Sequence, residues 1–390
     1  MIKQEFFKIV RNRSVPSAFL LIVLMIGLAV FSQYVPQNLP EDSSNYMEEW
    51  GGPVTPELEE RARELMREQD EQAARNSEAG AEMMDSPSYQ SSVLHNVALT
   101  GQQKTAMKER LDQIDHALNG EIGTYETRKL EMEKGMLTQA VDVVGYYPVR
   151  TWHDSVGIIE PAFTSVLISV LLMIGLSPVF NGDLRYRMSG MVGTSRHGAK
   201  RLVTAKILAS MLYATVIVFS LHAFHLLFKY MNYGSLEGWN APFQAISPEN
   251  FIVDFGMSPY SFTVWQYLVV MLGIQWFAAL AFSMVVLLFS QLFRSGLIVF
   301  FAGLSLIAAP PVIDRLNTGG HAWLEGFARV NYTEMFRTDR MFQEFTVFQV
   351  FQLPVLHPWF AIMVYAVITI MVTLVLYGLH EKQRSDMSEV

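Results

Sequence analysis

The chain has 390 residues, of which 51% are hydrophobic and 17% are charged, and its net charge is −8. This composition is too apolar for a large soluble enzyme, and it excludes fibrous and wholly disordered proteins. The absence of cysteine excludes disulfides, zinc–thiolate sites, iron–sulfur clusters and thiol catalysis. The composition therefore favours a protein embedded in a membrane.

Six stretches are apolar and almost free of charge, and each reaches the roughly 17–25 residues that a membrane-spanning helix needs. We therefore predict an all-α integral membrane protein with six transmembrane helices. An outer-membrane barrel would instead show strands of about 9–11 residues with alternating polarity. The predicted spans are 15–34, 156–180, 207–228, 264–290, 297–313 and 358–379. The segments that flank and connect them are 1–14, 35–155, 181–206, 229–263, 291–296, 314–357 and 380–390.

The distribution of basic residues predicts the orientation in the membrane. If residues 1–14 lie inside, the inside segments carry 13 Lys or Arg and 5 Asp or Glu, whereas the two short outside loops carry 5 Lys or Arg. Basic residues in short loops favour the cytoplasmic side. We therefore expect both termini in the cytoplasm and residues 35–155 outside the cell.

The first 14 residues have helical periodicity. Their apolar side chains repeat at i, i+4, i+7 and i+8, and basic side chains occupy the other positions, which predicts an amphipathic helix on the inner membrane surface. The apolar residues are Ile2, Phe6, Ile9 and Val10, and the basic ones are Lys3, Lys8, Arg11 and Arg13. A cleavable signal peptide ending near Ser32 is the alternative, but the apolar run is longer than the ~7–15 residues of a signal core.

Region 35–155 is predicted to form a helical domain. Thr55-Pro56-Glu57 has the residue types of a helix start, and Thr100 with Gln103 matches a capping box at a second start. Asn119-Gly120 ends this second helix, a weaker third pattern runs from Thr124 to about Ala140, and residues 76–92 resemble a linker. The helices either pack on one another as a spacer or contact a substrate or partner.

The loop 181–206 carries six basic residues and one acidic residue, with apolar side chains between them. It either binds the inner leaflet or presents a packed surface to a partner. Gly193 and Gly198 have the spacing of a phosphate-binding loop, but Ala199 replaces the lysine and Arg201 stands where a hydroxyl is needed. We therefore expect no nucleotide site on this chain.

Other candidate sites lie near the outside. His222 and His225 lie on one side of a predicted helix and contact either a neighbouring helix or a ligand. Glu160 lies just inside the membrane boundary, where carboxylates are often functional. Asn331-Tyr332-Thr333 matches a glycosylation pattern that is common by chance. The aromatic-rich segment 314–357 predicts short amphipathic helices that re-enter the outer leaflet, after a break of span five at Pro310-Pro311.

The chain has a basic surface helix, six predicted spans and a large region after span one. This layout, together with the loop stretch 181–207, resembles the permease subunit of ABC exporters of the type-two, ABCG-like (type V) kind. The family loop has an acidic residue, glycine, arginine and a final lysine. Asp183 stands where glutamate is commoner, Arg196 or Arg201 matches the arginine, Lys206 matches the lysine, and the family's proline is absent.

The resemblance implies a bacterial plasma-membrane permease without enzymatic activity. A separate ABC ATPase would bind ATP and magnesium, and a second permease copy or a homologous permease would complete the pathway. The residues expected to couple to the ATPase are Lys3, Lys8, Arg11, Asp183, Arg185, Arg187, Arg196, Lys200, Arg201 and Lys206. No bound cofactor, metal or nucleic acid is expected, whereas membrane lipid is.

Small residues in spans two and five suit a dimer interface or a transport pathway, because they let helices approach closely. These residues are Gly175, Ser177, Gly303, Ser305, Ala308 and Ala309. The expected activity is outward movement of an amphiphilic, lipidic, peptide or drug-like cargo. One alternative is an ATPase-driven mechanical or signalling protein that acts through region 35–155 without transport. A secondary transporter would show repeated halves and polar midplane residues, and the sequence has neither.

Overall fold

The computed structural model describes residues 1–32, 49–78, 89–147, 161–185, 198–233, 238–246, 255–316 and 331–388. The fold is mainly α-helical, as predicted, with two short antiparallel sheets that were not predicted. The helices are α1 (Ile2–Val10), α2 (Ser14–Ser32), α4 (Pro56–Glu78), α5 (Tyr89–Leu118), α6 (Thr124–Val143), α7 (Pro161–Leu176), α8 (Pro178–Arg185), α10 (Gly198–Tyr233), η2 (Phe243–Ile246), α11 (Val264–Leu292), α12 (Gly296–Leu316), α14 (Tyr332–Phe336), α15 (Thr338–Gln343) and α16 (His357–Ser388). The strands are β1 (Gly52–Pro53), β2 (Gly145–Tyr146), β3 (Val347–Val350) and β4 (Leu353–Leu356).

Five helices are long and apolar enough to cross a membrane, which is the architecture of a multi-pass membrane protein. They cover Ser14–Ser32, Phe163–Gly182, Lys200–Asn232, Val264–Leu292 and His357–Glu381. The fifth predicted span, 297–313, lies in α12, whose apolar part is the shorter stretch Gly296–Pro310.

Two predicted boundaries in these helices are wrong. Residues 198–206 were expected in a loop, but they form the first turns of α10, because Ala, Leu, Lys and Arg are good helix formers even where the sequence is too polar for a membrane. Pro310 and Pro311 do not break α12, which continues to Leu316. An interior proline removes an N–H donor and usually kinks or ends a helix, yet the residues after this pair remain helical.

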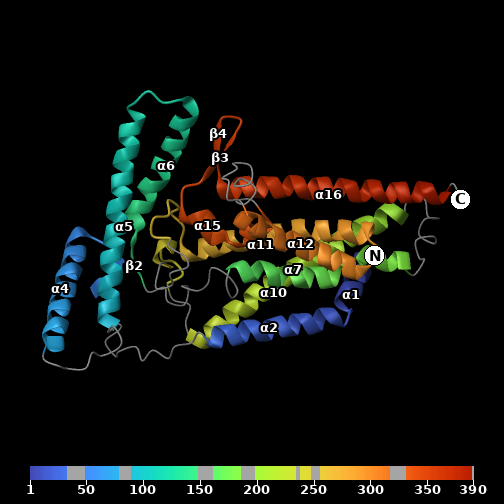
Figure 1. Cartoon of the computed structure of the whole chain (residues 1–390), viewed down its shortest axis with the longest axis horizontal. Coiled ribbons are helices and arrows are strands. Elements are labelled where there is room, and N and C mark those ends of the chain that lie inside the picture. The colour runs from blue at the N-terminus through green and yellow to red at the C-terminus, as the bar shows by residue number, and fades with distance from the viewer. Residues whose placement is uncertain are drawn as a thin grey trace.

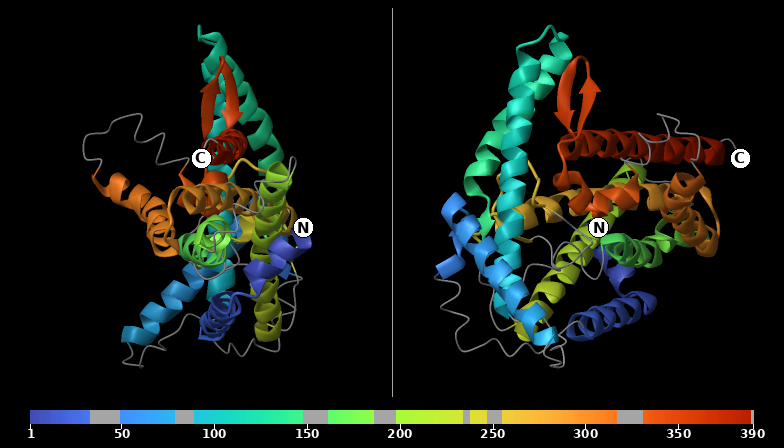
Figure 2. Two further views of the ribbon diagram at one scale, coloured as in Figure 1. Left: turned by 90° about the vertical axis from the view of Figure 1, so that its right-hand side faces the viewer. Right: turned by 60° about the vertical axis from the view of Figure 1, so that its left-hand side comes forward.

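The bundle is arranged along one direction, and the α4–α6 layer crosses one of its ends (Figure 1). The N and C termini lie at the other end, which we call the terminal end of the bundle. Figure 2 shows α12 on one side of the bundle and α16 on another. The bundle core is formed by α7, α10 and α11, where buried residues include Leu171, Tyr213 and Phe282.

The inserted region has apolar cores of its own. One joins α4 to the first half of α5 around Trp50 and Val97, and another joins the second half of α5 to α6 around Met107 and Leu137. The β1–β2 pair connects the beginning and the end of the region through Gly52↔Tyr146.

The helix starts in this region were predicted with mixed success. Thr55 accepts a hydrogen bond from the N–H of Leu58 at 3.3 Å, which confirms the predicted start of α4. The predicted start at Thr100 is wrong, because α5 begins at Tyr89 and the hydroxyl of Thr100 donates to the carbonyl of Asn96 inside the helix. A threonine within a helix can satisfy its hydroxyl in this way, so a capping pattern alone does not mark a start.

Segment 331–343 packs into the bundle rather than lying on it. Tyr332 of α14 stacks on Phe282 of α11 with ring centroids 4.5 Å apart, and Ser169 of α7 donates a hydrogen bond to its hydroxyl at 2.8 Å. Gln275 donates to the carbonyl of Phe336 at 3.1 Å. Backbone at membrane depth needs this helical, protein-covered form.

Candidate functional site

The terminal end of the bundle contains a buried ion pair. Nζ of Lys206, on the third span α10, lies 3.3 Å from Oε2 of Glu5 on α1, and the two side chains are 2% and 9% exposed. Oε1 of Glu5 also binds the exposed Lys8, at 2.6 Å. A carboxylate can accept from two cations, so Glu5 compensates the charge of the buried Lys206 while it also binds Lys8.

Lys206 also binds the end of the second span. Its ammonium donates to the carbonyl of Val179 in α8 at 2.5 Å and lies 5.3 Å from the ring centroid of Phe180. One side chain therefore connects α1, α8 and α10, and we call Glu5, Lys206 and Val179 the three-helix junction. An ammonium has three donors and a favourable interaction with an aromatic face, which suits it to this position.

The break between α7 and α8 is held by Ser290 near the end of α11. Its Oγ accepts from the backbone N–H of Phe180 at 3.0 Å and donates to the carbonyl of Ser177 at 2.8 Å. A helix that begins at Pro178 leaves its first N–H groups without partners inside the helix, and Ser290 supplies one. The three-helix junction is thereby connected to α11 as well.

The predicted apolar face of α1 is only partly correct. Ile9 is buried and Phe6 is half-buried, but Ile2 and Val10 are 41% and 38% exposed. The buried stripe instead passes through Glu5 and Ile9, one turn apart. The sequence analysis did not single out Glu5: an acidic residue is normally exposed, and nothing local in the sequence indicates Lys206 as its partner.

The other predicted coupling residues divide into three groups. Lys200 pairs with Glu381 of α16 at 2.5 Å, so it joins the beginning of the third span to the end of the last helix. Lys3, Arg11 and Arg201 are exposed, and Lys3 lies 6.0 Å from the ring centroid of Phe7. The side chains of Asp183 and Arg185, and the whole of Arg187 and Arg196, lie outside the described part of the chain.

Some of the small residues predicted for a dimer interface or pathway pack within the chain, and others are exposed on α12. Gly175 and Gly303 serve close packing within the chain, because a Cβ at these positions would lie 2.5 Å from the Tyr213 ring and 2.5 Å from Sδ of Met173, respectively. Ser177 belongs to the break beside Ser290. Ser305, Ala308 and Ala309 are exposed on α12 and are the ones that could face lipid or another chain.

His222 and His225 are buried on α10, with exposed fractions of 6% and 3%. His222 lies beside Gln275 of α11, so it faces a neighbouring helix. In the described ranges no three His, Asp or Glu side chains form a group that could hold a metal ion. Glu160 lies outside these ranges. Asn331 is 7% exposed and caps α14 by accepting from the N–H of Glu334 at 3.1 Å, so its glycosylation pattern is buried.

Asp339 of α15 is a buried charge that the sequence analysis missed. It is 1% exposed, and its Oδ1 has no hydrogen-bond partner among the described residues. Burial raises the pKa of this carboxyl group, while Arg337 and Arg340 act in the opposite direction. An aspartate among aromatic residues of a loop gives no periodic signal in the sequence.

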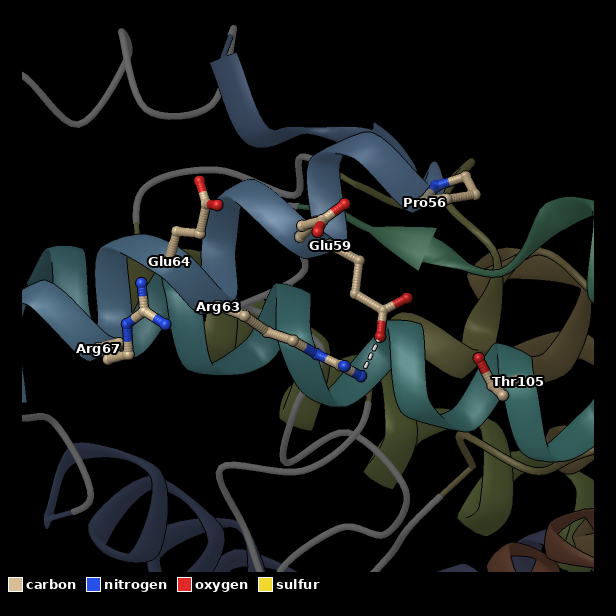
Figure 3. A pocket seen from close by; sticks show the side chains of 7 residues that line it. Pro56, Glu59, Arg63, Glu64, Arg67 and Thr105 are labelled. Atoms are coloured by element: carbon tan, nitrogen blue, oxygen red, sulfur yellow. Dashed lines mark hydrogen bonds and ion pairs between the residues drawn. The ribbon is translucent and has the colours of Figure 1, made fainter.

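A surface pocket lies on α4 beside α5, at the far end from the termini (Figure 3). It is lined by charges of both signs, and Glu59 and Arg63 form an ion pair across one turn. Such alternating, mutually paired charges are typical of a solvated helix surface and indicate no single ligand chemistry.

No protein-family model matches the chain, and neither the curated proteins nor the solved structures that were compared with it include a match.

Proposed function

We propose that the chain is the permease subunit of an ATP-driven exporter with six spans. Five of them would be the long apolar helices, and α12 would be the sixth. The observation that carries this proposal is the three-helix junction. A surface helix, the end of span two and the beginning of span three meet at one buried side chain, so a force on any of them moves all three. Such a unit is what an external ATPase needs in order to act on membrane helices.

The charges at the terminal end support the same assignment. Residues 1–14 and 198–206 together present exposed Lys3, Lys8, Arg11, Lys200 and Arg201, and basic residues in short segments favour the cytoplasm. We place both termini in the cytoplasm of a bacterial cell and the α4–α6 layer outside its plasma membrane. The ATPase would dock on this basic end and would hold the ATP and magnesium.

A second permease copy, or a homologous permease, would complete the pathway. The exposed small residues Ser305 and Ala308 of α12 suit close approach by another helix. A bundle lined by apolar and aromatic side chains favours an amphiphilic cargo over a bare ion.

The proposal is tested with the complex from the native membrane. An affinity-tagged chain should co-purify with a protein that contains a phosphate-binding GxxxxGK[ST] loop, and the reconstituted complex should hydrolyse ATP and move a fluorescent amphiphile outward. Charge reversal at Arg185, Arg187 and Arg201 should abolish the stimulation of ATP hydrolysis without affecting membrane insertion. The matched control is Lys108→Glu, an exposed reversal on α5, which should change neither. Full stimulation in the triple variant would refute the coupling assignment.

One observation favours a mechanical alternative. The outer region contacts the segments that precede two spans: Ser261, before α11, donates to Oε1 of Gln139 on α6 at 3.4 Å, and Arg128 of α6 donates at 3.4 Å to the carbonyl of Gln352 in the β3–β4 turn, before α16. Movement of α11 and α16 would therefore reach α6. If ATP hydrolysis changes the distance between spin labels on α6 and α16 while no cargo moves, the mechanical function replaces the exporter.

A further inference from the structure

The β3–β4 hairpin has one wholly apolar face. The strand register pairs Phe348 with Val355 and Val350 with Leu353, and side chains of paired residues lie on the same face of a sheet. Leu353 is 52% exposed. The segment from Phe345 to Leu356 has no charged residue, although it belongs to an otherwise polar loop region.

This face turns toward the last span, and the opposite face turns toward the outer region. Phe348 stacks on Phe360 of α16, with ring centroids 4.3 Å apart and an interplanar angle of 16°. On the other face, Pro354 is buried and α6 contacts β4. Arg128 of α6 holds the turn through the carbonyl of Gln352. The hairpin therefore has α6 on one side and, beyond Phe348, no covering element among the described residues.

The direction of the hairpin follows from both ribbon views. It rises roughly perpendicular to α16 and away from α11 (Figures 1 and 2). Because α16 crosses the membrane along its axis, the hairpin lies about parallel to the membrane surface at the point where α16 enters. Four residues of strand extend ~13 Å. The tip of the hairpin therefore extends sideways past α16 and lies over the lipid around this helix.

The tip is a phenylalanine that the turn does not require. Phe351 is 97% exposed. Phe351 and Gln352 have φ values of 47° and 65°, the left-handed pair that a two-residue hairpin turn of type I′ needs. Asn-Gly suits such a turn best, and a bulky residue with positive φ is an outlier. The local backbone therefore gives no reason for an aromatic side chain at this position.

An exposed apolar surface of α16 begins beside Phe360, the residue on which Phe348 stacks. That surface begins with Trp359, which is 61% exposed, and follows one stripe of the helix through Met363, Val367, Ile370, Met371 and Leu374. An exposed tryptophan in the first turn of a span is typical of the membrane–water interface.

We propose that the β3–β4 hairpin lies on the outer surface of the bilayer and that Phe351 inserts into it, with Val350 and Leu353 beside it. The hairpin thereby fixes the level of α6 above the membrane. The proposal requires that α16 spans a bilayer with the α4–α6 layer outside, as proposed above, and it is independent of whether the chain exports a cargo.

The absence of cysteine allows a direct test by single-cysteine spin labelling of the full-length protein in phosphatidylcholine vesicles. Labels at Phe351→Cys and Leu353→Cys should collide with oxygen, which partitions into lipid, and should be protected from a water-soluble nickel chelate. The matched control is Gln349→Cys, an exposed position on the opposite face, which the chelate should reach. The oxygen-to-chelate ratio should be several-fold higher at position 351 than at position 349.

Equal ratios at positions 351 and 349 would overturn the proposal. Labels at position 351 that are immobilised and protected from both reagents would also overturn it, because they would show a covering protein, such as a second copy of this chain. Phe351→Asn gives a further readout, since asparagine suits the turn. With this substitution the label at position 353 should lose part of its protection from the chelate while the protein remains folded.

Discussion

Glu5 and Lys206 are 201 residues apart in the chain, yet their charged groups lie 3.3 Å apart in the interior of the bundle. This pair decides which face of α1 is buried. Burying an ammonium without a counter-charge costs more free energy than burying one isoleucine gains, so the face that carries Glu5 turns inward. The first helix is thus part of the packed bundle and is fixed to the second and third spans.

We expect removal of one partner of this pair to cost much more than removal of both. Glu5→Leu leaves Lys206 buried without Glu5 and should lower the free energy of unfolding by about 3–5 kcal/mol, whereas Glu5→Leu combined with Lys206→Met should be close to neutral. Thermal unfolding in detergent measures the difference. The control is Lys8→Ala, which removes an exposed pair partner and should cost about 0–1 kcal/mol. Equal loss in the single and double variants would contradict a buried pair.

Two tryptophan substitutions on α12 should have opposite outcomes. At Gly303 a side chain collides with Met173, so Gly303→Trp should reduce folding and yield by overpacking, which typically costs about 1–3 kcal/mol or more. Ala308 is exposed, so Ala308→Trp should fold normally and impair only assembly or transport. Size-exclusion profiles and flux in proteoliposomes separate these effects. Normal assembly and flux in Ala308→Trp would remove α12 from the proposed interface.

The buried carboxyl of Asp339 should make stability dependent on pH. Since burial raises its pKa above the usual 3.8, the folded state holds this proton more tightly than the unfolded state. The contribution of this group to stability therefore falls as the pH rises from about 3.8 through the raised value. Asp339→Asn removes a buried charge whose Oδ1 has no hydrogen-bond partner among the described residues, and it should stabilise the protein by about 1–3 kcal/mol at neutral pH. The gain in Tm should shrink at acidic pH, and a gain that does not change with pH would contradict this explanation.

Labelling of single cysteines tests the proposed orientation. Ala117 is exposed on α5 and Gln4 is exposed on α1, at opposite ends of the molecule, so each position can be replaced by cysteine. An impermeant maleimide should label position 117 in intact cells and position 4 only after permeabilisation. The reverse pattern would invert the topology and would place the three-helix junction away from any cytoplasmic ATPase.

The periodicity and length of apolar runs were sufficient to predict most of the membrane helices. The predicted span 264–290 corresponds to α11 at Val264–Leu292, and 15–34 corresponds to α2 at Ser14–Ser32. This agreement has a simple cause: a helix in lipid satisfies its backbone hydrogen bonds within itself, so its position depends on local composition. The start of α10 failed as a prediction because a polar helical extension has no hydropathy signal.

The contacts that make up the candidate site depend on tertiary structure. No local pattern indicates that Glu5 faces Lys206 or that Ser290 completes the break before Pro178, because these partners come from helices that are far apart in the sequence. The same limit applies to the small residues: Gly175 and Gly303 have the composition of an interface, but whether they face Tyr213, Met173 or another chain depends on how the helices are rotated. The β3–β4 hairpin was missed because strands gain their hydrogen bonds from a partner segment, and its Phe351-Gln352 turn lacks the glycine or asparagine that marks such turns.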